Sequence, residues 1–334
     1  MQQKTAVVLF NLGGPDSLAA VRPFLFNLFS DPAIIAAPRP IRWLLAKYIS
    51  AKRAPVAQDI YRQIGGRSPL LEQTQRQASA LEARLGNGYK CFIAMRYWHP
   101  FTEEAVEAVR QFAPQRVVLL PLYPQYSHTT SGSSFGAWAK AAADLPDPYR
   151  ICCYPELPGL AQAFAEGLHQ ALIEASRFGP PKVLFSAHGL PKKLILKGDP
   201  YQHQVERTAA SIRRALGEKI DSQVCYQSRV GPLEWIGPET VTEIKAAGAE
   251  SRPVIVVPLA FVSEHSETLV ELDIEYRHVA EASGSPCYLR VPTPCDHPAF
   301  IADLAELAQN AKPGTEPGGA ACAGTGFTCP GAHL

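Results

Sequence analysis

The sequence predicts a doubly wound α/β protein in which helices cover both faces of parallel sheets. Short runs rich in β-branched residues are apolar throughout and are bounded by Gly, Pro or Asn. Longer stretches with a helical period separate them, and apolar strands that alternate with helices are typical of buried parallel sheets. In such folds ligands bind where strands end and loops begin, so the residues after each strand are the candidates for function.

The expected elements follow one another in this alternation. The expected strands are residues 6–10, 90–94, 116–120, 149–153, 182–186, 223–226, 253–259 and 287–291. Helical periods are clearest over residues 102–112, 160–176, 204–216 and 238–246.

A weak internal repeat divides the chain into two halves. Residues 7–15 resemble residues 183–191, and residues 116–122 resemble residues 253–259, in the same order. A chance similarity of apolar strands is the alternative. The repeat predicts two similar lobes facing each other across a cleft. We place them at residues 1–155 and 156–310, followed by a flexible tail of residues 311–334 that is rich in Pro and Gly.

The first half carries an insertion. Asn11 and Pro121 are 110 positions apart, whereas Ser186 and Pro258 are 72 apart, so about 38 residues are added. The best candidate is segment 24–55, where large apolar residues are interleaved with Arg and Lys. Such residues commonly pack in a core. They also suit a lip that touches an anionic bilayer or a flat hydrophobic ligand.

Composition excludes several classes of protein. The formal net charge of +1 argues against a nucleic-acid binder held by a strong basic field. No run approaches the roughly 18 apolar residues of a membrane-spanning helix. The first apolar run, residues 6–10, is too short for a signal peptide and is expected to be a strand. We therefore expect a cytoplasmic protein with peripheral contact to the inner face of the membrane.

The chain contains eight cysteines, for which a reducing compartment makes disulfides improbable. Six of them lie in or beside strand-like runs, where a small buried hydrophobe is the simplest interpretation. Cys322 and Cys329 lie in the tail beyond the Pro/Gly-rich linker and have no evident packing role.

A histidine follows the carboxyl end of one expected strand. His188 lies in Ser186-Ala187-His188-Gly189-Leu190-Pro191, where Gly189 and Pro191 turn the chain. This position favours a catalytic role in a cleft. A histidine whose ring is satisfied by a loop carbonyl is the alternative.

An acidic segment follows the equivalent strand of the second half. Residues 261–273 hold four carboxylates and His265 at the start of a helix. Glu267 and Glu271 are four positions apart, so they are expected on one face, where they suit proton transfer or a hard cation. Complementation of the helix dipole is the alternative, and it explains Glu264 better than Glu271.

Two further loops follow strands, namely residues 96–100 and the Ser/Thr-rich residues 123–134. The second suits carboxylate or phosphate binding, although such loops often serve only as helix caps. The sequence has no phosphate loop, no dinucleotide fingerprint and no structural-zinc spacing.

Several long motifs occur together and in order: Asn11 to Pro15, Tyr61 to Pro69, Met95 to Tyr97 with His99-Pro100, Leu122 to Ser127, Phe185 to Pro191 with Gly198 to Tyr201, Tyr226 to Pro232, and His265 to Tyr276. On these motifs the chain resembles the ferrochelatase family over nearly all of its length up to Leu304. The resemblance implies a lyase of haem biosynthesis that inserts Fe(II) into protoporphyrin IX to give protohaem. It also implies two chelatase-type lobes around a porphyrin cleft.

The resemblance assigns roles residue by residue. His188 matches the active-site histidine and Glu267 its acidic partner, and both are implied to bind Fe²⁺ or to accept protons, while Glu271 and Asp273 continue the acidic face. The positions that match the lining of the porphyrin pocket are Leu12, Arg96, Tyr97, Tyr123 and Trp235. A neutral imidazole, with a pKa of about 6.5, is suited to removing pyrrole protons. The alternatives are a chelatase for another metal or porphyrin and a non-catalytic tetrapyrrole carrier.

Some members of the family bind a 2Fe–2S cluster through tail cysteines and one cysteine from mid-chain. This implies Cys322 and Cys329 as ligands, with Cys152 or Cys153 as the inner ligand. Four thiolates are needed, and only two cysteines lie in this tail, so one ligand stays unassigned. A tail with no cluster is the alternative.

Overall fold

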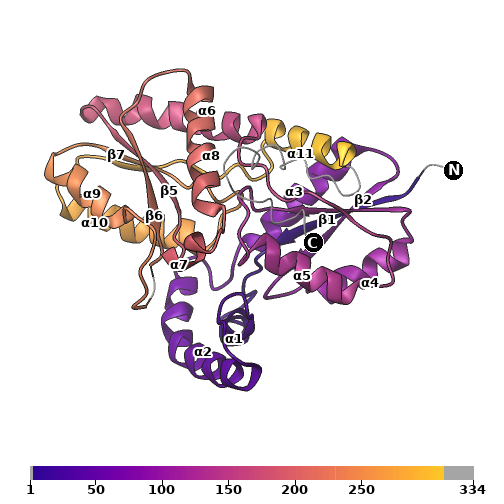
Figure 1. Ribbon diagram of the computed structural model, residues 1–334. Coiled ribbons are helices and arrows are strands. Elements are labelled where there is room, and N and C mark those ends of the chain that lie inside the picture. Colours follow the sequence, from indigo (N-terminus) through magenta and orange to yellow (C-terminus); the bar gives the residue numbers. More distant parts are fainter. Residues whose placement is uncertain (1–2, 230, 312–334) are drawn as a thin grey trace. The chain divides into compact units, whose positions relative to one another are not determined.

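The computed structural model describes residues 3–229 and 231–311 of the chain, which forms two compact units. One unit comprises Met1–Cys153 and Leu304–Leu334, and the other comprises Tyr154–Asp303. Each unit holds one four-stranded parallel sheet with helices around it (Figure 1). The predicted fold class is thereby confirmed.

The first sheet has the order β2-β1-β3-β4. Its strands are β1 (Thr5–Asn11), β2 (Tyr89–Met95), β3 (Arg116–Pro121) and β4 (Tyr149–Arg150). Thr5 lies opposite both Tyr89 and Arg116, so β1 is hydrogen-bonded on both sides. All of β1 is buried, which explains why its sequence is apolar with no alternation. The helices described in this unit are α1 (Val21–Ser30), α2 (Arg39–Arg62), α3 (Leu70–Leu85), α4 (Thr102–Phe112) and α5 (Ser131–Ala141).

The second sheet has the equivalent order β6-β5-β7-β8. Its strands are β5 (Lys182–His188), β6 (Ser222–Gln227), β7 (Val254–Val257) and β8 (Tyr288–Arg290). Its helices are α6 (Pro158–Ala175), η1 (Ser176–Phe178), α7 (Lys192–Leu196), α8 (Tyr201–Leu216), α9 (Thr240–Ala249), the π-helix η2 (Glu267–Glu275) and α10 (Tyr276–Ala282). Helix α11 (Pro298–Asn310) begins in this unit and ends in the first.

The two sheets confirm the internal repeat. Strands β1 and β5 hold the same position in their sheets, and so do β3 and β7. Between β1 and β2 the chain forms α1, α2 and α3, whereas α7 and α8 join β5 to β6. The insertion therefore corresponds to the pair α1 and α2, whose violet ribbons lie together in Figure 1. Of the described helices, none combines the length and the apolar character needed to cross a bilayer.

Some element ends differ from the prediction for local reasons. The strand expected over residues 253–259 ends at Val257, because Pro258 has no backbone N–H for the ladder. The strand expected over residues 149–153 pairs only at Tyr149 and Arg150, although residues 151–154 stay buried.

Glycine makes one close helix contact possible in the second unit. The backbone N–H of Gly159 donates to Asp303 Oδ2 at 2.5 Å, and a Cβ at Gly159 would collide with the carbonyl oxygen of Ala299. We expect Gly159→Ala to lower the free energy of unfolding by about 1–3 kcal/mol, the usual cost of overpacking.

The matched control is Gly136→Ala in α5, where no atom lies within 4 Å of the added Cβ. It should be neutral or should stabilise the helix by about 0.5–1 kcal/mol. Thermal and urea unfolding, followed by circular dichroism, measure both variants. Equal stability of the two variants would contradict the packing argument.

Candidate active site

His188 is the last residue of β5, and its side chain is partly exposed, as its place after a buried strand predicts. Its backbone carbonyl accepts a hydrogen bond from the Tyr201 hydroxyl at 3.0 Å. The indole of Trp235 lies against the next residue, since a Cβ on Gly189 would be 3.2 Å from Trp235 Cε3. The structure therefore places Trp235 beside the loop that follows His188; the family resemblance implies His188 for chemistry and Trp235 for porphyrin binding.

Glu267 begins helix η2 and contacts a second imidazole. His265 Nδ1 lies 2.6 Å from Glu267 Oε2, with side chains 11% and 29% exposed. The His265 ring also packs edge-on against Phe261. Burial raises the pKa of Glu267, but His265, its hydrogen bond and the charge of His188 lower it further, so the net pKa lies well below its usual range. Glu267 is thus ionised at neutral pH and lies within the electrostatic influence of His188.

The pKa of His265 is shifted in the opposite direction. Burial lowers this pKa, but the carboxylates of Glu267, Glu264 and Glu271 outweigh burial and raise the pKa above its usual value. The carboxylates around His265 thus favour the protonated form of its ring beside Glu267.

Glu271 lies one turn further along η2 and is held by several donors. The backbone N–H of Ser228 donates to Oε1 at 2.9 Å, and the Tyr276 hydroxyl donates to the same oxygen at 2.9 Å. Oε2 accepts from the Ser228 hydroxyl and from Gln227 Nε2. An ionised carboxylate only accepts hydrogen bonds, so this set of donors suits the charged form.

A buried chain of side chains fixes that arrangement. The Ser186 hydroxyl donates to Gln227 Oε1 at 2.8 Å and lies 2.9 Å from Thr240 Oγ1. These three side chains are at most 1% exposed. Because Oε1 of Gln227 accepts from Ser186, its amide Nε2 faces Glu271. The ends of β5 and β6 thus orient a carboxylate on η2.

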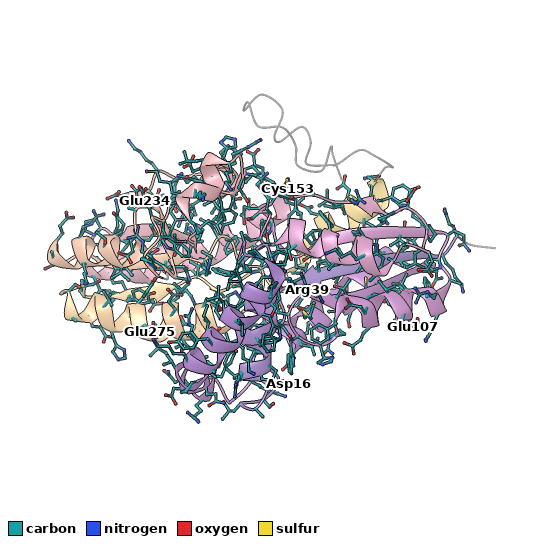
Figure 2. All side chains as sticks on the ribbon, turned by 60° about the horizontal axis from the view of Figure 1, so that its bottom comes forward. Asp16, Arg39, Glu107, Cys153, Glu234 and Glu275 are labelled. Atoms are coloured by element: carbon teal, nitrogen blue, oxygen red, sulfur yellow. The ribbon has the colours of Figure 1, made fainter. Side chains whose placement is uncertain are left out.

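A third carboxylate, Glu275, follows at the same spacing of four residues and is labelled in Figure 2. Burial and the negative charge of Glu271 raise its pKa. Glu275 was not predicted as a site residue, although the regular spacing of Glu267, Glu271 and Glu275 in the sequence pointed to it.

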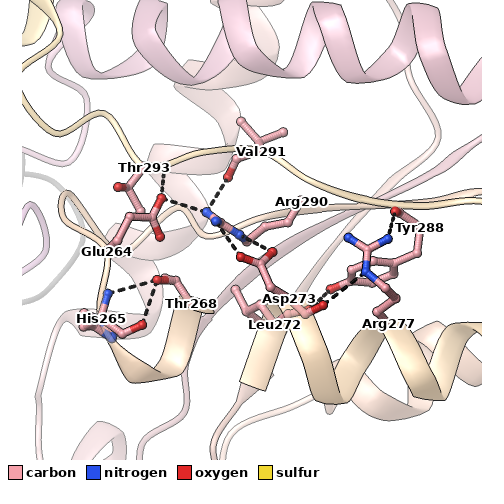
Figure 3. Close-up of polar contacts among 10 residues, drawn as sticks. All are labelled: Glu264, His265, Thr268, Leu272, Asp273, Arg277, Tyr288, Arg290, Val291 and Thr293. Carbon is pink, nitrogen blue, oxygen red and sulfur yellow. Dashed lines mark hydrogen bonds and ion pairs between the residues drawn. The ribbon is translucent and has the colours of Figure 1, made fainter. Parts of the chain in front are cut away.

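Asp273 does not continue this acidic face, and that expectation is wrong. Its carboxylate pairs with Arg290, with Nε to Oδ1 at 2.7 Å and Nη2 to Oδ2 at 2.8 Å (Figure 3). Glu264 pairs with the same guanidinium at 2.8 Å. A residue two positions from Glu271 points to a different side of the helix, so spacing alone was the better guide.

The predicted porphyrin-binding residues of the first unit also gather at strand ends. The N–H of Arg96 donates to the Asn11 carbonyl and the N–H of Tyr97 to the Leu12 carbonyl, both at 2.9 Å, so the two loops run side by side. Leu12 packs in the same apolar cluster as Tyr97. Burial and the nearby Tyr97 raise the pKa of Tyr123, which keeps its phenol neutral.

Asp31 organises this group and was missed in the sequence. Its Oδ2 lies 2.8 Å from Arg96 Nη2 and accepts hydrogen bonds from the hydroxyls of Tyr97 and Ser133. Burial raises the pKa of Asp31, but Ser133, the N–H of Ala33, Arg96 and Tyr97 lower it more. Ser133 also accepts from Arg96 Nε at 2.7 Å, so the Ser/Thr-rich loop positions this arginine. The feature of the sequence that could have pointed to Asp31 is that it is a single carboxylate within an apolar stretch.

The described residues contain no group of three or more His, Cys, Asp or Glu side chains arranged to hold a metal ion. Cys152 and Cys153 are 0% and 1% exposed and belong to the apolar core of the first unit. Cys322 and Cys329 lie outside the described residues.

Comparison with known proteins identifies the family. The model of the ferrochelatase family matches residues 4–312. The ferrochelatase of Caulobacter vibrioides (strain NA1000 / CB15N) is 54% identical over 323 residues, which cover 94% of this chain and 93% of that protein. The ferrochelatase of Phenylobacterium zucineum (strain HLK1) is 52% identical over 335 residues, covering 99% and 96%.

A solved structure supports the fold. The sirohydrochlorin chelatase SirB of Bacillus subtilis subspecies spizizenii, in complex with cobalt, matches 92% of this chain and 95% of its own with a TM-score of 0.51 and 13% identity. The family match over nearly the whole chain, together with relatives that are 52% and 54% identical over most of its length, leads to one conclusion: the chain belongs to the ferrochelatase family.

Proposed function

We propose that His188, Glu267 and Glu271 carry out the reaction of the ferrochelatase family in this chain, the insertion of Fe(II) into protoporphyrin IX to form protohaem. The observation that carries the proposal is geometric: one unit places a partly exposed imidazole, His188, at the end of β5 and a carboxylate, Glu267, paired with His265 at 2.6 Å, at the start of η2. Family membership supplies the substrates, and the roles of the three residues are our assignment, supported by their positions in the second unit. Assays that pair protoporphyrin IX with coproporphyrin III, and Fe²⁺ with Co²⁺, test the choice of substrates.

The chemistry needs a proton acceptor and a charged ligand. A neutral porphyrin loses two N–H protons as Fe²⁺ enters, so the product is neutral and two protons leave. Neutral imidazole is a suitable general base at neutral pH. An imidazole and a carboxylate together are also reasonable ligands for Fe²⁺. We assign both tasks to His188 and Glu267, with Glu271 and its hydrogen-bonded donors behind them.

The aromatic and cationic residues are proposed to bind the porphyrin. Arg96 is one-quarter exposed and is anchored on the buried Asp31, so its guanidinium is available to a propionate. Leu12, Tyr97, Tyr123 and Trp235 offer apolar and aromatic contacts to the macrocycle. A rigid set of contacts of this kind can spend binding energy on distorting the ring and exposing its nitrogens.

His188→Ala should keep the fold and bind porphyrin while losing turnover by about 10²–10⁴-fold, the usual contribution of a general base. Iron or zinc insertion, followed by absorbance, gives turnover, and quenching of Trp fluorescence gives porphyrin affinity. His278→Ala is the control, because His278 is exposed on α10 and should leave turnover unchanged. Near-normal turnover of His188→Ala would overturn the assignment.

Glu267→Gln should reduce turnover at least tenfold and leave porphyrin affinity within about twofold, since it removes a charge and little volume.

Glu267→Gln should also change the pH dependence of stability. The lowered pKa of Glu267 stabilises the fold above its unfolded pKa of about 4.3, and the raised pKa of His265 stabilises it below about 6.5.

The stabilisation by this pair is therefore greatest between these values and is lost as the pH rises through the raised pKa of His265. The difference in unfolding free energy between Glu267→Gln and the native protein should be largest between about pH 4.3 and about pH 6.5 and should shrink as the pH rises through the raised pKa of His265. Urea unfolding at a series of pH values measures it. A difference that does not change with pH would show that the ion pair is not formed.

The helix pair α1 and α2 is proposed as a membrane-contacting lip. Its exposed apolar side chains include Trp43 at 49%, Leu44 at 61% and Tyr48 at 64% exposure. Lys47 lies over the Trp43 ring at 5.0 Å from its centroid, and further cations follow along α2. Apolar side chains beside cations suit docking on an anionic bilayer surface, where a poorly soluble porphyrin is held. Peripheral attachment to the inner membrane follows from this proposal.

Replacing Trp43 and Leu44 by Ser should lower partition onto vesicles containing anionic lipid by about tenfold or more, because burial of a large apolar side chain contributes roughly 1.5–3 kcal/mol. Sedimentation with vesicles measures partition, which should also fall with rising salt. Phe178→Ser, at an apolar side chain of 52% exposure in the second unit, is the control. Equal partition of the two variants would contradict the proposed contact of the lip with the membrane.

The residues do not fit the 2Fe–2S cluster well, because the two candidate inner ligands, Cys152 and Cys153, are both enclosed in the apolar core. No step of the reaction above passes through a cluster. Acid-labile sulfide and visible absorption of protein purified without oxygen measure the cluster directly.

A further inference from the structure

Arg290, at the end of β8, is a nearly buried cation whose side chain is 10% exposed. It pairs with two carboxylates through different nitrogens. Nε and Nη2 bind Asp273 at 2.7 and 2.8 Å, and Nη1 binds Glu264 at 2.8 Å (Figure 3). The two-point contact with Asp273 uses the planar fork of the guanidinium, which a lysine cannot reproduce.

The two carboxylates flank the proposed catalytic segment. Glu264 directly precedes His265, and Asp273 lies within η2 beyond Glu271. Glu264 Oε1 also accepts from the N–H of Thr293 at 3.0 Å, which fixes it to the chain that leaves β8. One guanidinium therefore holds both ends of the segment that carries His265, Glu267 and Glu271.

The conformation of that segment makes such a tie necessary. In a π-helix the backbone hydrogen bonds join residues five positions apart, one more than in an α-helix. Such turns are rare and occur frequently at functional sites. Rewinding the segment as an α-helix by one residue would turn a side chain by about 100°. That rotation would separate Glu267 from His265, or Glu271 from Ser228 and Tyr276.

We propose that Arg290 is a positioning residue that holds the π-helical turn of η2 by binding Glu264 and Asp273, and so keeps Glu267 and Glu271 in place. It touches neither the substrate nor the reacting atoms. The inference rests on the proposed roles of Glu267 and Glu271, and it adds a residue outside every motif that identified the family.

The test compares Arg290→Met with Arg277→Met. Arg277 also contacts both η2 and β8, but it pairs with no carboxylate among the described residues. It donates to the carbonyls of Asp273 at 3.2 Å and Tyr288 at 2.9 Å, its guanidinium lies 5.2 Å from the centroid of the Tyr288 ring, and it is exposed. Arg290→Met should lower kcat at least tenfold with KM for porphyrin within twofold, whereas Arg277→Met should stay within twofold of the native kcat. The acidic limb of the pH profile of kcat should move upward in Arg290→Met, because Glu267 loses its aligned partner.

A merely structural role would lower the fraction of active protein and leave the pH profile of the remaining activity unchanged, which would overturn the proposal. Asp273→Asn gives a second arm if Arg290→Met does not fold, since it removes the two-point pair and keeps the volume. It should show the same fall in kcat and the same shift in the pH profile. Native-like kinetics in Asp273→Asn would also overturn the proposal.

Hydrogen–deuterium exchange separates this inference from the proposed function. Amides of residues 267–275 should exchange at least tenfold faster in Arg290→Met than in Arg277→Met, whether or not the protein inserts metal. Unchanged exchange contradicts the clamp, whereas faster exchange in a chain that inserts no metal at all contradicts only the proposed function.

Discussion

The pairing of β5 with strands on both sides is the constraint on which the second unit depends. Strand β7 pairs with β5 as far as Phe185, and β6 pairs with it as far as His188, so the sheet fixes the end of β5 at which His188 lies. The same pairing places Gln227 opposite His188 in the ladder. From there the buried Ser186 and Gln227 transmit a defined orientation to Glu271. The hydrogen bonds of the sheet thus position Gln227, and Gln227 in turn orients the carboxylate of Glu271 on η2.

Charge balance is the second constraint, and both units solve it in the same way. Each unit keeps a poorly solvated carboxylate ionised by surrounding it with donors and a cation. In the first unit Asp31 accepts from Tyr97 and Ser133 beside Arg96, and in the second Glu264 and Asp273 share Arg290. Unpaired charges in such places would be strongly destabilising, so each cluster is also a fixed point of the structure.

The sequence was sufficient for the parts that obey local rules. Apolar runs separated by helical periods gave the sheets, and the similarity of residues 7–15 to residues 183–191 gave equivalent strands in the two units. The position of His188 followed from the end of a buried strand. Asp31 and Arg290 could not be found in this way, because their partners are distant in the sequence and only tertiary packing joins them. The role that the resemblance implied for Asp273 is wrong, because its carboxylate turns away from Glu271 and pairs with the distant Arg290.

The repeat also separates two tasks that one strand end could have combined. Leu12 of the first half aligns with His188 of the second, so equivalent positions after equivalent strands carry an apolar side chain in one unit and an imidazole in the other. In the assignment proposed above, the proton chemistry belongs to the second unit, while porphyrin contacts are proposed in both units, with Trp235 in the second. The duplicated topology therefore carries a single base, because the position equivalent to His188 holds a side chain that cannot accept a proton.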